Sequence, residues 1–545
     1  MIRLSTGLIR PWHAVALILA TIGNGNARAQ SMHPLIRATD KTVNIKDGTI
    51  FQKAIWTLSP DVKPDVYYAL SPDTSHKVTF YTDIDSISFI VNPGDTYDFF
   101  ILLNDTDTCY TQIRSIKPEA ILVKKMSPDD LQHDFTFLKE ALQREHAGLY
   151  RYISETEFIL ISDSLQQTLN HPMDQFEFGT MVKFYLGAIR DGHTGSSLPS
   201  ELMKYYSQHV KMFPVQLHFI GHRAYVLFGG PPGLPPGTEL LAIDGESVDG
   251  IRKQLFRYLS GDGRIESKKY WVLNKDGFPF LYSWAFGEKH EYTVKYKTQS
   301  SETKTINLTA QYLKEPCNAG HPKSDADKHL RLEYLPRNTA VLTVATFSSA
   351  RLGQTGEDFV QFLKNSFSEI NTKQIDQLII DLRGNSGGDD KYGSLLYSYL
   401  TSKPFRYFSS IETTSRKLKV TEHPGLGEQA PAVNNFNGKV IFLINGLCFS
   451  TTSDFCAVAK SNRRGKFVGE ETGGAYYGNT SGENFRTTLP NSSIHIKIPK
   501  HKYQTAVRKT KYSDRGIIPD YIVIPDIGDV ISGRDVQMIF ALKLI

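Results

Sequence analysis

The chain has few cysteines. Only Cys109, Cys317, Cys448 and Cys456 occur in 545 residues, and no two of them form a CxxC pair. Structural zinc sites draw on closely spaced Cys and His ligands, so this spacing argues against a structural metal. Cys448 and Cys456 could form a disulfide only if their Cα atoms lay within about 7 Å of each other. We expect them to be free, buried thiols.

Long hydrophobic runs and long charged runs are also missing. After the N-terminus no apolar segment reaches the roughly 20 residues that a membrane span needs, so no membrane span is expected. The 62 basic and 57 acidic residues give a net charge of +5, with no Lys/Arg block, and nucleic acid is therefore not indicated as a partner. A chain of 545 residues, 40% of them hydrophobic, predicts three or four globular domains at roughly 150 residues each.

Residues 1–29 have the layout of a cleavable secretory signal. Arg3 and Arg10 precede the apolar run "WHAVALILATIG", and "ARA" stands directly before Gln30. No cysteine follows this site, so an acyl anchor is not expected. The pattern predicts a periplasmic or secreted protein, with an uncleaved anchor as the alternative.

The next two regions differ in hydrophobic period. Residues 30–123 are rich in β-branched and aromatic residues, and "KVTFYTDIDSISFIV" alternates with a period near two, which predicts an N-terminal all-β domain. At Ser127 the pattern changes, because "SPDDLQHDFTFLKEALQREHAGLY" begins with a capping Ser, a Pro and two acids. Residues 124–210 are therefore expected to be a helical cap region.

The remainder of the chain is predicted to be an insert followed by an α/β core. Residues 211–310 resemble a PDZ-type module, since "GTELLAIDGESV" and the amphipathic segment after it match the end of such domains, and a PDZ-like groove would bind an extended peptide. In residues 331–545 apolar strands alternate with helices, which indicates a largely parallel sheet covered on both faces. The segments "IHIKIP" and "DYIVIP" are expected as strands beside that sheet.

Two Gly-containing turns could contribute to a catalytic site. "RDGHTG", residues 190–195, places His193 on a turn where the imidazole could act as a general base, although a lone His is more often packed or on the surface. "IIDLRGNSGGDD", residues 379–390, ends a strand in a loop whose Gly387 and Gly388 could aim N–H groups at an anion. Neither a P-loop nor a dinucleotide-binding spacing is present, so this loop suits an oxyanion hole better than a phosphate site.

Ser450, in "IFLINGLCFSTTSDF", admits two interpretations. After a strand at 439–445, its hydroxyl could cap the next helix by accepting an N–H from residue 452 or 453, with a stabilisation of about 1 kcal/mol. The same helix N-terminus would favour a nucleophilic alkoxide, with the Thr451 N–H directed at an oxyanion. Near the end of the chain, Asp514 in "YSDRGIIPDYIVIP" could orient a histidine or simply form a surface ion pair.

Taken in order, these motifs resemble the C-terminal processing (tail-specific) serine peptidase family, in particular its tricorn-core and interphotoreceptor retinoid-binding-protein-like branch. The match rests on Asp191–Thr194, the insert, "DLRGNSGG" at 381–388, Phe449–Asp454 and Gly516–Asp520. The resemblance implies Ser450 as nucleophile, His193 as base, and Gly388 with the Thr451 N–H as the oxyanion hole. It implies a ClpP/crotonase-like αβ catalytic domain, and thus a multidomain α/β plus β protein with helical cap, PDZ-like insert and N-terminal all-β domain.

Two departures from the family pattern refine this expectation. The processing-protease branch has a Lys about 25 residues beyond the Ser, but "GEETGGAYYGN" contains none, so the resemblance favours a Ser–His mechanism over a Ser–Lys dyad. The family's late acid would fall at Ser513, with Asp514 one residue later and Glu470 and Glu471 as further candidates.

The sequence therefore predicts a periplasmic or secreted serine endopeptidase that acts on a peptide or protein substrate without a cofactor or metal. A catalytically inactive peptide-binding protein on the same scaffold is the alternative, since fold does not guarantee function. An acyl-CoA enzyme of the crotonase type is a distant third possibility. Oligomeric state is not indicated.

Overall fold

The computed structural model describes seven strands between residues 37 and 114, and then residues 125–231, 233–298, 300–312, 328–511 and 513–545. The expected signal segment 1–29 and Cys317 lie outside the described residues. By its internal contacts the chain divides into two compact units, Met1–Ile121 and Leu122–Ile545. Within the described residues, no helix has both the length and the apolar character needed to cross a membrane.

The described part of the first unit consists of strands. They form two antiparallel sheets, with strand orders β1-β2-β5 and β4-β3-β6-β7. The strands are β1 (Arg37–Lys46), β2 (Thr49–Ile55), β3 (Pro64–Ser71), β4 (Thr79–Thr82), β5 (Ser86–Ile90), β6 (Thr96–Leu103) and β7 (Asp107–Arg114).

The second unit begins with three packed helices. They are α3 (Pro128–Glu145), α4 (Glu155–Thr168) and α5 (Gln175–Ile189). Ser127 caps α3, as expected, because its hydroxyl accepts the Asp130 N–H and the Asp130 carboxylate accepts the Ser127 N–H. Apolar residues of all three helices share one buried core, which includes Leu138, Phe158 and Tyr185. The helix α5 ends at Arg190 with a left-handed φ of 60°, and this reversal starts the turn that carries His193.

An antiparallel sheet and several short helices follow. The sheet has the order β10-β11-β12-β14-β15, with β13 paired to β12, and its core includes Leu217, Leu240 and Ile251. The elements are β8 (Gly195–Ser197), α6 (Ser200–His209), β9 (Lys211–Met212), β10 (Gln216–Ile220), β11 (Arg223–Phe228), β12 (Glu239–Ile243), β13 (Glu246–Ser247), α7 (Val248–Phe256), α8 (Ser267–Val272), the π-helical turn Leu273–Gly277, α9 (Phe278–Phe286), β14 (Glu291–Lys297), β15 (Thr303–Thr309) and β16 (Gln311–Tyr312).

The last part is built on a sheet with the order β17-β18-β19-β23-β24-β27. Within this sheet, strands β18, β19, β23, β24 and β27 run parallel, and β17 pairs antiparallel with β18 at one edge. The elements are β17 (Leu330–Leu335), β18 (Thr339–Val344), α10 (Ser349–Gln354), α11 (Phe359–Thr372), β19 (Gln377–Asp381), α12 (Asp390–Ser398), β23 (Lys439–Ile444), α13 (Thr451–Ser461), β24 (Lys466–Gly469), β27 (Tyr521–Ile522), α14 (Ile527–Ser532) and α15 (Val536–Lys543).

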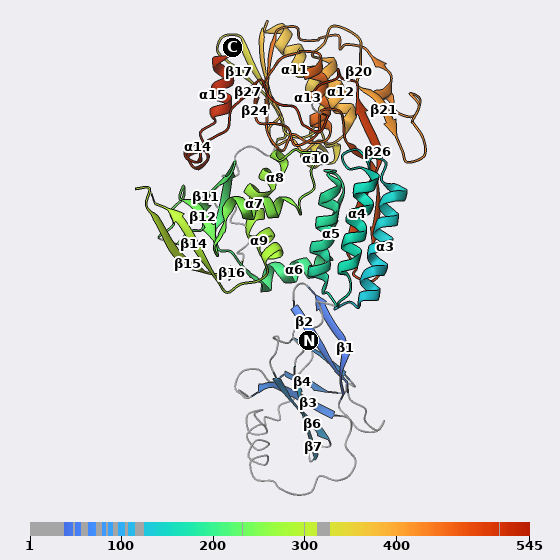
Figure 1. Ribbon diagram of the computed structural model, residues 1–545, viewed down its shortest axis with the longest axis vertical. Coiled ribbons are helices and arrows are strands. Elements are labelled where there is room, and N and C mark those ends of the chain that lie inside the picture. The colour runs from blue at the N-terminus through green and yellow to red at the C-terminus, as the bar shows by residue number, and fades with distance from the viewer. Residues whose placement is uncertain are drawn as a thin grey trace, which may run out of the picture. The chain divides into compact units, whose positions relative to one another are not determined.

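Helices cover both faces of this sheet, as Figure 1 shows. Alternate residues of each strand point to opposite faces, so Leu342, Ile380 and Phe442 pack in the core formed with α11, α12 and α13. Val341, Ile379 and Ile441 pack on the other face, in a core that includes Ala541 of α15. Burial on both faces accounts for the near-continuous apolar runs of these strands.

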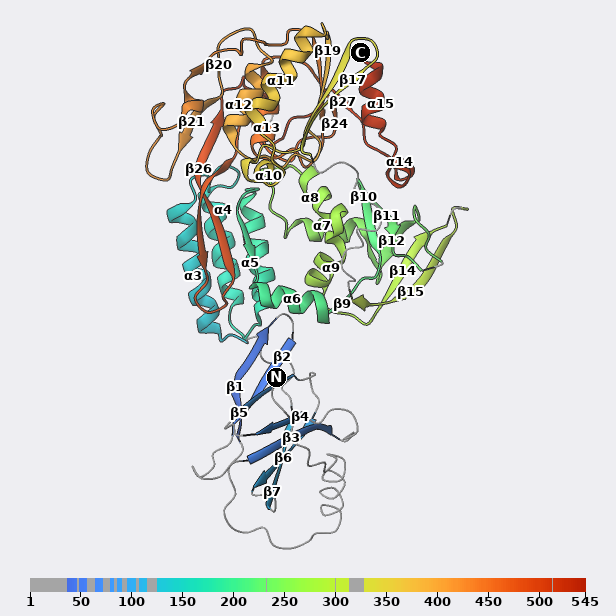
Figure 2. The ribbon, with the colours of Figure 1, turned by 180° about the vertical axis from the view of Figure 1, so that it is seen from behind.

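One strand expectation is wrong. The segment "IHIKIP" does not lie beside the parallel sheet. It belongs to β26 (His495–Thr505), which is the middle strand of a separate sheet of order β21-β26-β25, and β8 also pairs with β26. Its inward side chains Ile496 and Ile498 pack in the helical core, and Figure 2 shows β26 running down beside α3. The remaining elements are β20 (Phe405–Arg406), β21 (Phe408–Glu412), the 3-10 turn Pro424–Leu426, β22 (Glu428–Gln429) and β25 (Thr480–Thr488).

Candidate active site

Ser450 occupies the turn between β23 and α13. Its backbone angles are φ 56° and ψ −129°, a region that residues other than glycine rarely adopt. Its side chain makes no capping hydrogen bond, and the hydroxyl therefore does not take the capping role that the local sequence allowed. A strained serine at a strand-to-helix turn is the backbone arrangement used for the nucleophiles of several hydrolases.

The glycine loop after β19 lies against Ser450. A Cβ added to Gly387, whose φ is 102°, would lie 2.7 Å from the Ser450 Cβ and 3.1 Å from the Thr451 nitrogen. Gly388 has a φ of 146° and approaches Phe347 so closely that a Cβ would lie 2.1 Å from the Phe347 carbonyl carbon. Any side chain at either position would displace the loop from the serine.

Two backbone N–H groups are available beside Ser450. Thr451 is the first residue of α13, and in the described part of the chain neither its N–H nor that of Gly388 has a hydrogen-bond acceptor. The Thr451 hydroxyl donates to the Gly388 carbonyl oxygen at 2.6 Å, which ties the loop to the helix terminus. Free donors at a helix N-terminus favour a developing negative charge, so these two groups suit an oxyanion hole.

Asn385 and Asn445 fix the two loops that meet at Ser450. The Asn385 amide donates to the Val344 carbonyl at 2.9 Å, and its Oδ1 accepts the Gly387 N–H at 2.9 Å. The Oδ1 of Asn445 accepts the N–H of Gly384 and that of Leu447, each at 3.1 Å. The parallel strands β19 and β23 end side by side, and these amides join the loops that follow them.

His193 lies on a tight turn built by Asp191. The Oδ1 of Asp191 accepts the His193 N–H, the Thr194 N–H and the Thr194 hydroxyl, each at 3.0 Å. His146 supports this turn, since its Nε2 lies 2.8 Å from the Thr194 hydroxyl while its Nδ1 accepts the Gly148 N–H at 3.1 Å. These contacts set the direction in which the His193 side chain leaves the backbone.

The His193 ring packs on Phe449, the residue before Ser450. The two rings stack with centroids 4.4 Å apart. The Lys268 Nζ lies 3.5 Å from the centroid of the same Phe449 ring. The Nδ1 of His193 is fully buried without a hydrogen-bond partner. No hydrogen bond within the described residues joins His193 to the Ser450 hydroxyl, and catalytic contacts of this kind often tighten only when substrate binds.

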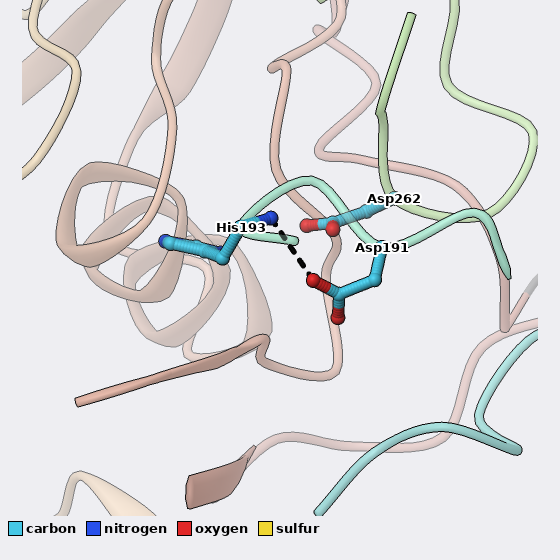
Figure 3. Close-up of side chains that lie close together, drawn as sticks. All are labelled: Asp191, His193 and Asp262. Carbon is cyan, nitrogen blue, oxygen red and sulfur yellow. Dashed lines mark hydrogen bonds between the residues drawn. The ribbon is translucent and has the colours of Figure 1, made fainter. Parts of the chain in front are cut away.

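Buried charges surround His193. A His193 ring nitrogen and one carboxylate oxygen each of Asp191 and Asp262 lie within 4.8 Å of one another, and Figure 3 shows the two carboxylates beside the His193 backbone. Such a set can attract a cation, and the ammonium group of Lys268 supplies a positive charge next to it. The structure thus gives these carboxylates a cationic neighbour from the protein itself.

The pKa values of the cluster are displaced in different directions. Burial lowers the pKa of His193 to about 3, against the effect of Asp191, so the imidazole is neutral at pH 7. Burial and then the Asp191 charge raise the pKa of Asp262 to about 6. Burial also lowers the pKa of Lys268 to about 8. At neutral pH the cluster therefore contains a neutral base, a charged Asp262 and a charged Lys268.

The late acids named from the sequence lie elsewhere. Asp514 forms an ion pair with Arg264, whose Nη2 donates at 3.1 Å, and Ser513 is exposed. Glu471 pairs with Arg515 at 2.6 Å. Burial raises the pKa of Glu470, which contacts Gln537. The structure brings none of these four side chains into the cluster around His193.

Asp262 and Lys268 are not indicated by the sequence, and Phe449 is indicated only as part of the nucleophile motif, without its contact to His193. Asp262 and Lys268 lie about 70 residues after His193, in "GDGRIESKK", where only the Gly-Asp-Gly turn signal is visible. Their role depends on the docking of this segment against the His193 turn, which no local pattern reports. Cys448 and Cys456 are free and buried, as expected, and burial raises the pKa of Cys448 to about 12.

Ser450 is a strained serine between a parallel strand and a helix, next to free backbone donors, and the half-buried imidazole of His193 stacks on the residue before it. This is the arrangement of a serine-type hydrolase. Residues 338–523 match the model of peptidase family S41, and this match supports the resemblance of the chain to the tail-specific serine peptidases. The matched range contains both the glycine loop and Ser450, while His193 precedes it.

Solved structures share the fold at low sequence identity. Mature CPAF complexed with lactacystin is 15% identical, with a TM-score of 0.55 over 76% of this chain and 97% of that chain. Another crystal structure of mature CPAF is 15% identical, with a TM-score of 0.53 over 74% of this chain and 94% of that one. No curated protein matches the chain in sequence.

Proposed function

We propose that this serine peptidase is an endopeptidase that hydrolyses peptides or unfolded chains through an acyl-enzyme formed on Ser450. The observation that carries the proposal is the strained backbone of Ser450. Its side chain does not cap the helix, and the residue lies against Gly387. A conformation of this kind requires about 1–3 kcal/mol of compensation from its surroundings, and such strain is concentrated at functional sites.

In the proposed reaction the Ser450 Oγ attacks the scissile carbonyl carbon. His193 takes the hydroxyl proton as the C–O bond forms and then gives it to the leaving amine, which separates as the acyl-enzyme forms. The N–H groups of Gly388 and Thr451 stabilise the oxyanion, a contribution of roughly 10²–10³ in rate for one such donor. A water molecule then attacks the acyl carbon while His193 takes its proton, and the bond to the Ser450 Oγ breaks as His193 returns the proton to the serine, which releases the carboxylic acid product.

The neutral state of His193 at pH 7 supports its assignment as the base. Its stacking on Phe449 supports it as well, because this contact keeps the ring beside the residue that precedes the nucleophile. A Ser–Lys dyad has no counterpart at the position expected from the family, although Lys268 lies close by. The Lys268 Nζ donates to the Gly192 carbonyl at 2.8 Å, so it contacts the backbone of the His193 turn.

The location and the insert are also part of the proposal. The N-terminal segment 1–29 supports export to the periplasm or medium, and N-terminal sequencing of the exported protein, expected to begin at Gln30, tests this. The sheet of β10 to β15 is proposed to act as a PDZ-like module that accepts an extended chain at its edge.

Ser450→Ala tests the nucleophile. The variant should lose covalent labelling by a fluorophosphonate probe and lose hydrolysis of an unfolded, dye-quenched protein substrate by roughly 10⁴-fold or more. Ser453→Ala is the matched control, because the Ser453 hydroxyl is buried and donates to the Cys448 carbonyl at 2.8 Å. Equal labelling of folded Ser450→Ala and wild type would refute the assignment. Binding of the substrate by wild type with no turnover would instead indicate an inactive peptide-binding protein.

A further inference from the structure

Side chains of the insert hydrogen-bond to both backbone polar groups of Gly192, the residue between Asp191 and His193. The Oδ1 of Asp262 accepts the Gly192 N–H at 2.7 Å, and Lys268 Nζ donates to the Gly192 carbonyl at 2.8 Å. A Cβ on Gly192 would lie 2.8 Å from Phe449 ring carbons and 2.9 Å from the Asp262 carboxylate. Both polar atoms of Gly192 are therefore held by side chains that come from one segment, residues 262–268.

Asp262 joins three parts of the site. It is completely buried, and its second carboxylate oxygen accepts the Ala475 N–H at 3.3 Å, from the loop that follows β24. The Gly263 N–H donates to the carbonyl of Arg190 at 3.0 Å, which docks the same loop on the end of α5. The Asp262 side chain thus lies at the junction of the helical cap, the insert and the peptidase core.

Asp191 and Asp262 have different tasks at this junction. The Oδ1 of Asp191 is occupied by three donors of its own turn, so this carboxylate shapes the backbone around His193. Asp262 accepts a single N–H from that turn, and one of its oxygens lies within 4.8 Å of a His193 ring nitrogen. Besides this Asp262 carboxylate, the charged groups that face His193 from the surrounding elements are Asp191, Lys268, Lys497 and Arg151.

We propose that Asp262 is a positioning residue for His193, which fixes the Gly192 peptide and adds its negative charge to that of Asp191 in stabilising the imidazolium formed when His193 takes the Ser450 proton. This inference rests on the proposed function, in which that proton transfer occurs. A buried carboxylate that orients a catalytic histidine stabilises the imidazolium without itself accepting the proton. Lys268 balances the charge of Asp262 and contacts Phe449, and so links the His193 turn to the nucleophile turn.

Asp514 acts one step further away in this scheme. Its backbone carbonyl accepts the Arg264 N–H at 3.0 Å, and its carboxylate pairs with the Arg264 side chain. Gly263, with a φ of 57°, allows this approach, since a Cβ there would lie 2.6 Å from the Asp514 carbonyl oxygen. The late acid expected from the sequence therefore anchors the loop that carries Asp262 and does not touch His193.

Asp262→Asn tests the charge, because the Asn side chain keeps an oxygen for the Gly192 N–H. In the full chain this variant should lower kcat roughly 10²- to 10⁴-fold and change KM less than threefold. Asp262→Ala removes the acceptor as well and should lower kcat further. Glu266→Gln is the matched control in the same segment, since Glu266 is exposed and its carboxylate lies 3.5 Å from Arg252; it should leave kcat within twofold.

The pH profile separates the charge from a purely structural role. Wild-type kcat should fall as the pH drops through about 6, where Asp262 gains a proton, and Asp262→Asn should show a low rate that is flat over this range. A kcat of folded Asp262→Asn within twofold of wild type, or a loss confined to KM, would overturn the inference. If Ser450→Ala is inactive while Asp262→Asn is normal, only the role of Asp262 fails; if Ser450→Ala is active, the proposed function fails first.

Discussion

At the scale of single residues, Ser450 and Gly387 determine each other's conformation. Ser450 has a left-handed φ without a capping bond, and Gly387 has a φ of 102° with no room for a side chain beside it. Neighbouring residues make the contacts that hold this strained conformation. The Thr451 hydroxyl donates to the Gly388 carbonyl, and the Asn385 side chain accepts the Gly387 N–H. The local sequence "CFSTTSDF" shows only a serine before a helix.

Gly387→Ala should therefore damage catalysis more than folding. The added methyl displaces the loop from Ser450 and moves the Gly388 N–H, so kcat should fall roughly 10²- to 10³-fold, with a loss of about 1–3 kcal/mol in unfolding free energy. Gly384→Ala is the control, because Gly384 has a φ of 80° but no heavy atom within 4 Å of the added methyl. Steady-state kinetics and thermal unfolding of both variants measure the difference. Equal kcat in the two variants would contradict the proposed oxyanion loop.

At the scale of secondary-structure elements, the long hairpin of β25 and β26 connects the peptidase core to the helical cap. Leu489, Ile494, Ile496 and Ile498 of this hairpin lie in the same core as α3, α4 and α5. At the hairpin tip, the buried Asp134 of α3 accepts the Asn491 N–H at 2.9 Å and the Ser492 N–H at 2.7 Å. The His193 turn follows α5, so the packing of these helices positions the base relative to the core.

Asp134→Ala should loosen this connection. Two N–H groups, that of the buried Ser492 and that of the half-buried Asn491, would lose a charged acceptor, which should lower the unfolding free energy by about 2–4 kcal/mol and speed hydrogen exchange in residues 485–498. Asp163→Ala is the control, since Asp163 makes only a surface pair with Lys139 at 3.2 Å and should change stability by less than about 1 kcal/mol. Unchanged exchange at the hairpin in Asp134→Ala would contradict this account.

At the scale of the whole molecule, the buried charge of Asp262 in the proposed site lowers the free energy of unfolding at neutral pH. Asp262 has a folded pKa of about 6 against an ordinary value of 3.8, so between these pH values the folded protein holds a proton that the unfolded chain has released. Stability from this group is therefore greatest below about pH 4 and decreases as the pH rises to 6. Above pH 6 the buried charge opposes folding by about 3 kcal/mol at 1.36 kcal/mol per pKa unit.

Asp262→Asn should consequently be more stable than wild type at pH 7.5 and equal to it near pH 4. Urea unfolding at a series of pH values measures this difference. Asp249→Asn should show the opposite sign, because hydrogen bonds to Lys253 and Arg252 hold the pKa of Asp249 below its ordinary value. Its substitution should therefore lower stability above pH 4. A stability difference for Asp262→Asn that does not vary with pH would show that the group is not charged in the folded protein.

Several parts of the fold and site could be predicted from the sequence because their signals are local. The N-cap of α3, the apolar strands of the parallel sheet and the free thiols of Cys448 and Cys456 follow from nearby residue types. The strand "IHIKIP" was assigned to the wrong sheet because alternation specifies a strand without specifying its neighbour. The partner of β26 depends on packing against α3, some 360 residues earlier in the chain.

The sequence by itself determined the resemblance to the tail-specific serine peptidases and the motifs that contain Ser450, His193 and the glycine loop, because their spacing along the chain is the signal. Only the tertiary structure decided how the base is held. Asp262 and Lys268 reach Gly192 through a docked loop, and Asp514 supports that loop and not the histidine. Electrostatic interactions act over a few ångströms in space, and no pattern of neighbouring residues records which distant charges the fold brings within that range.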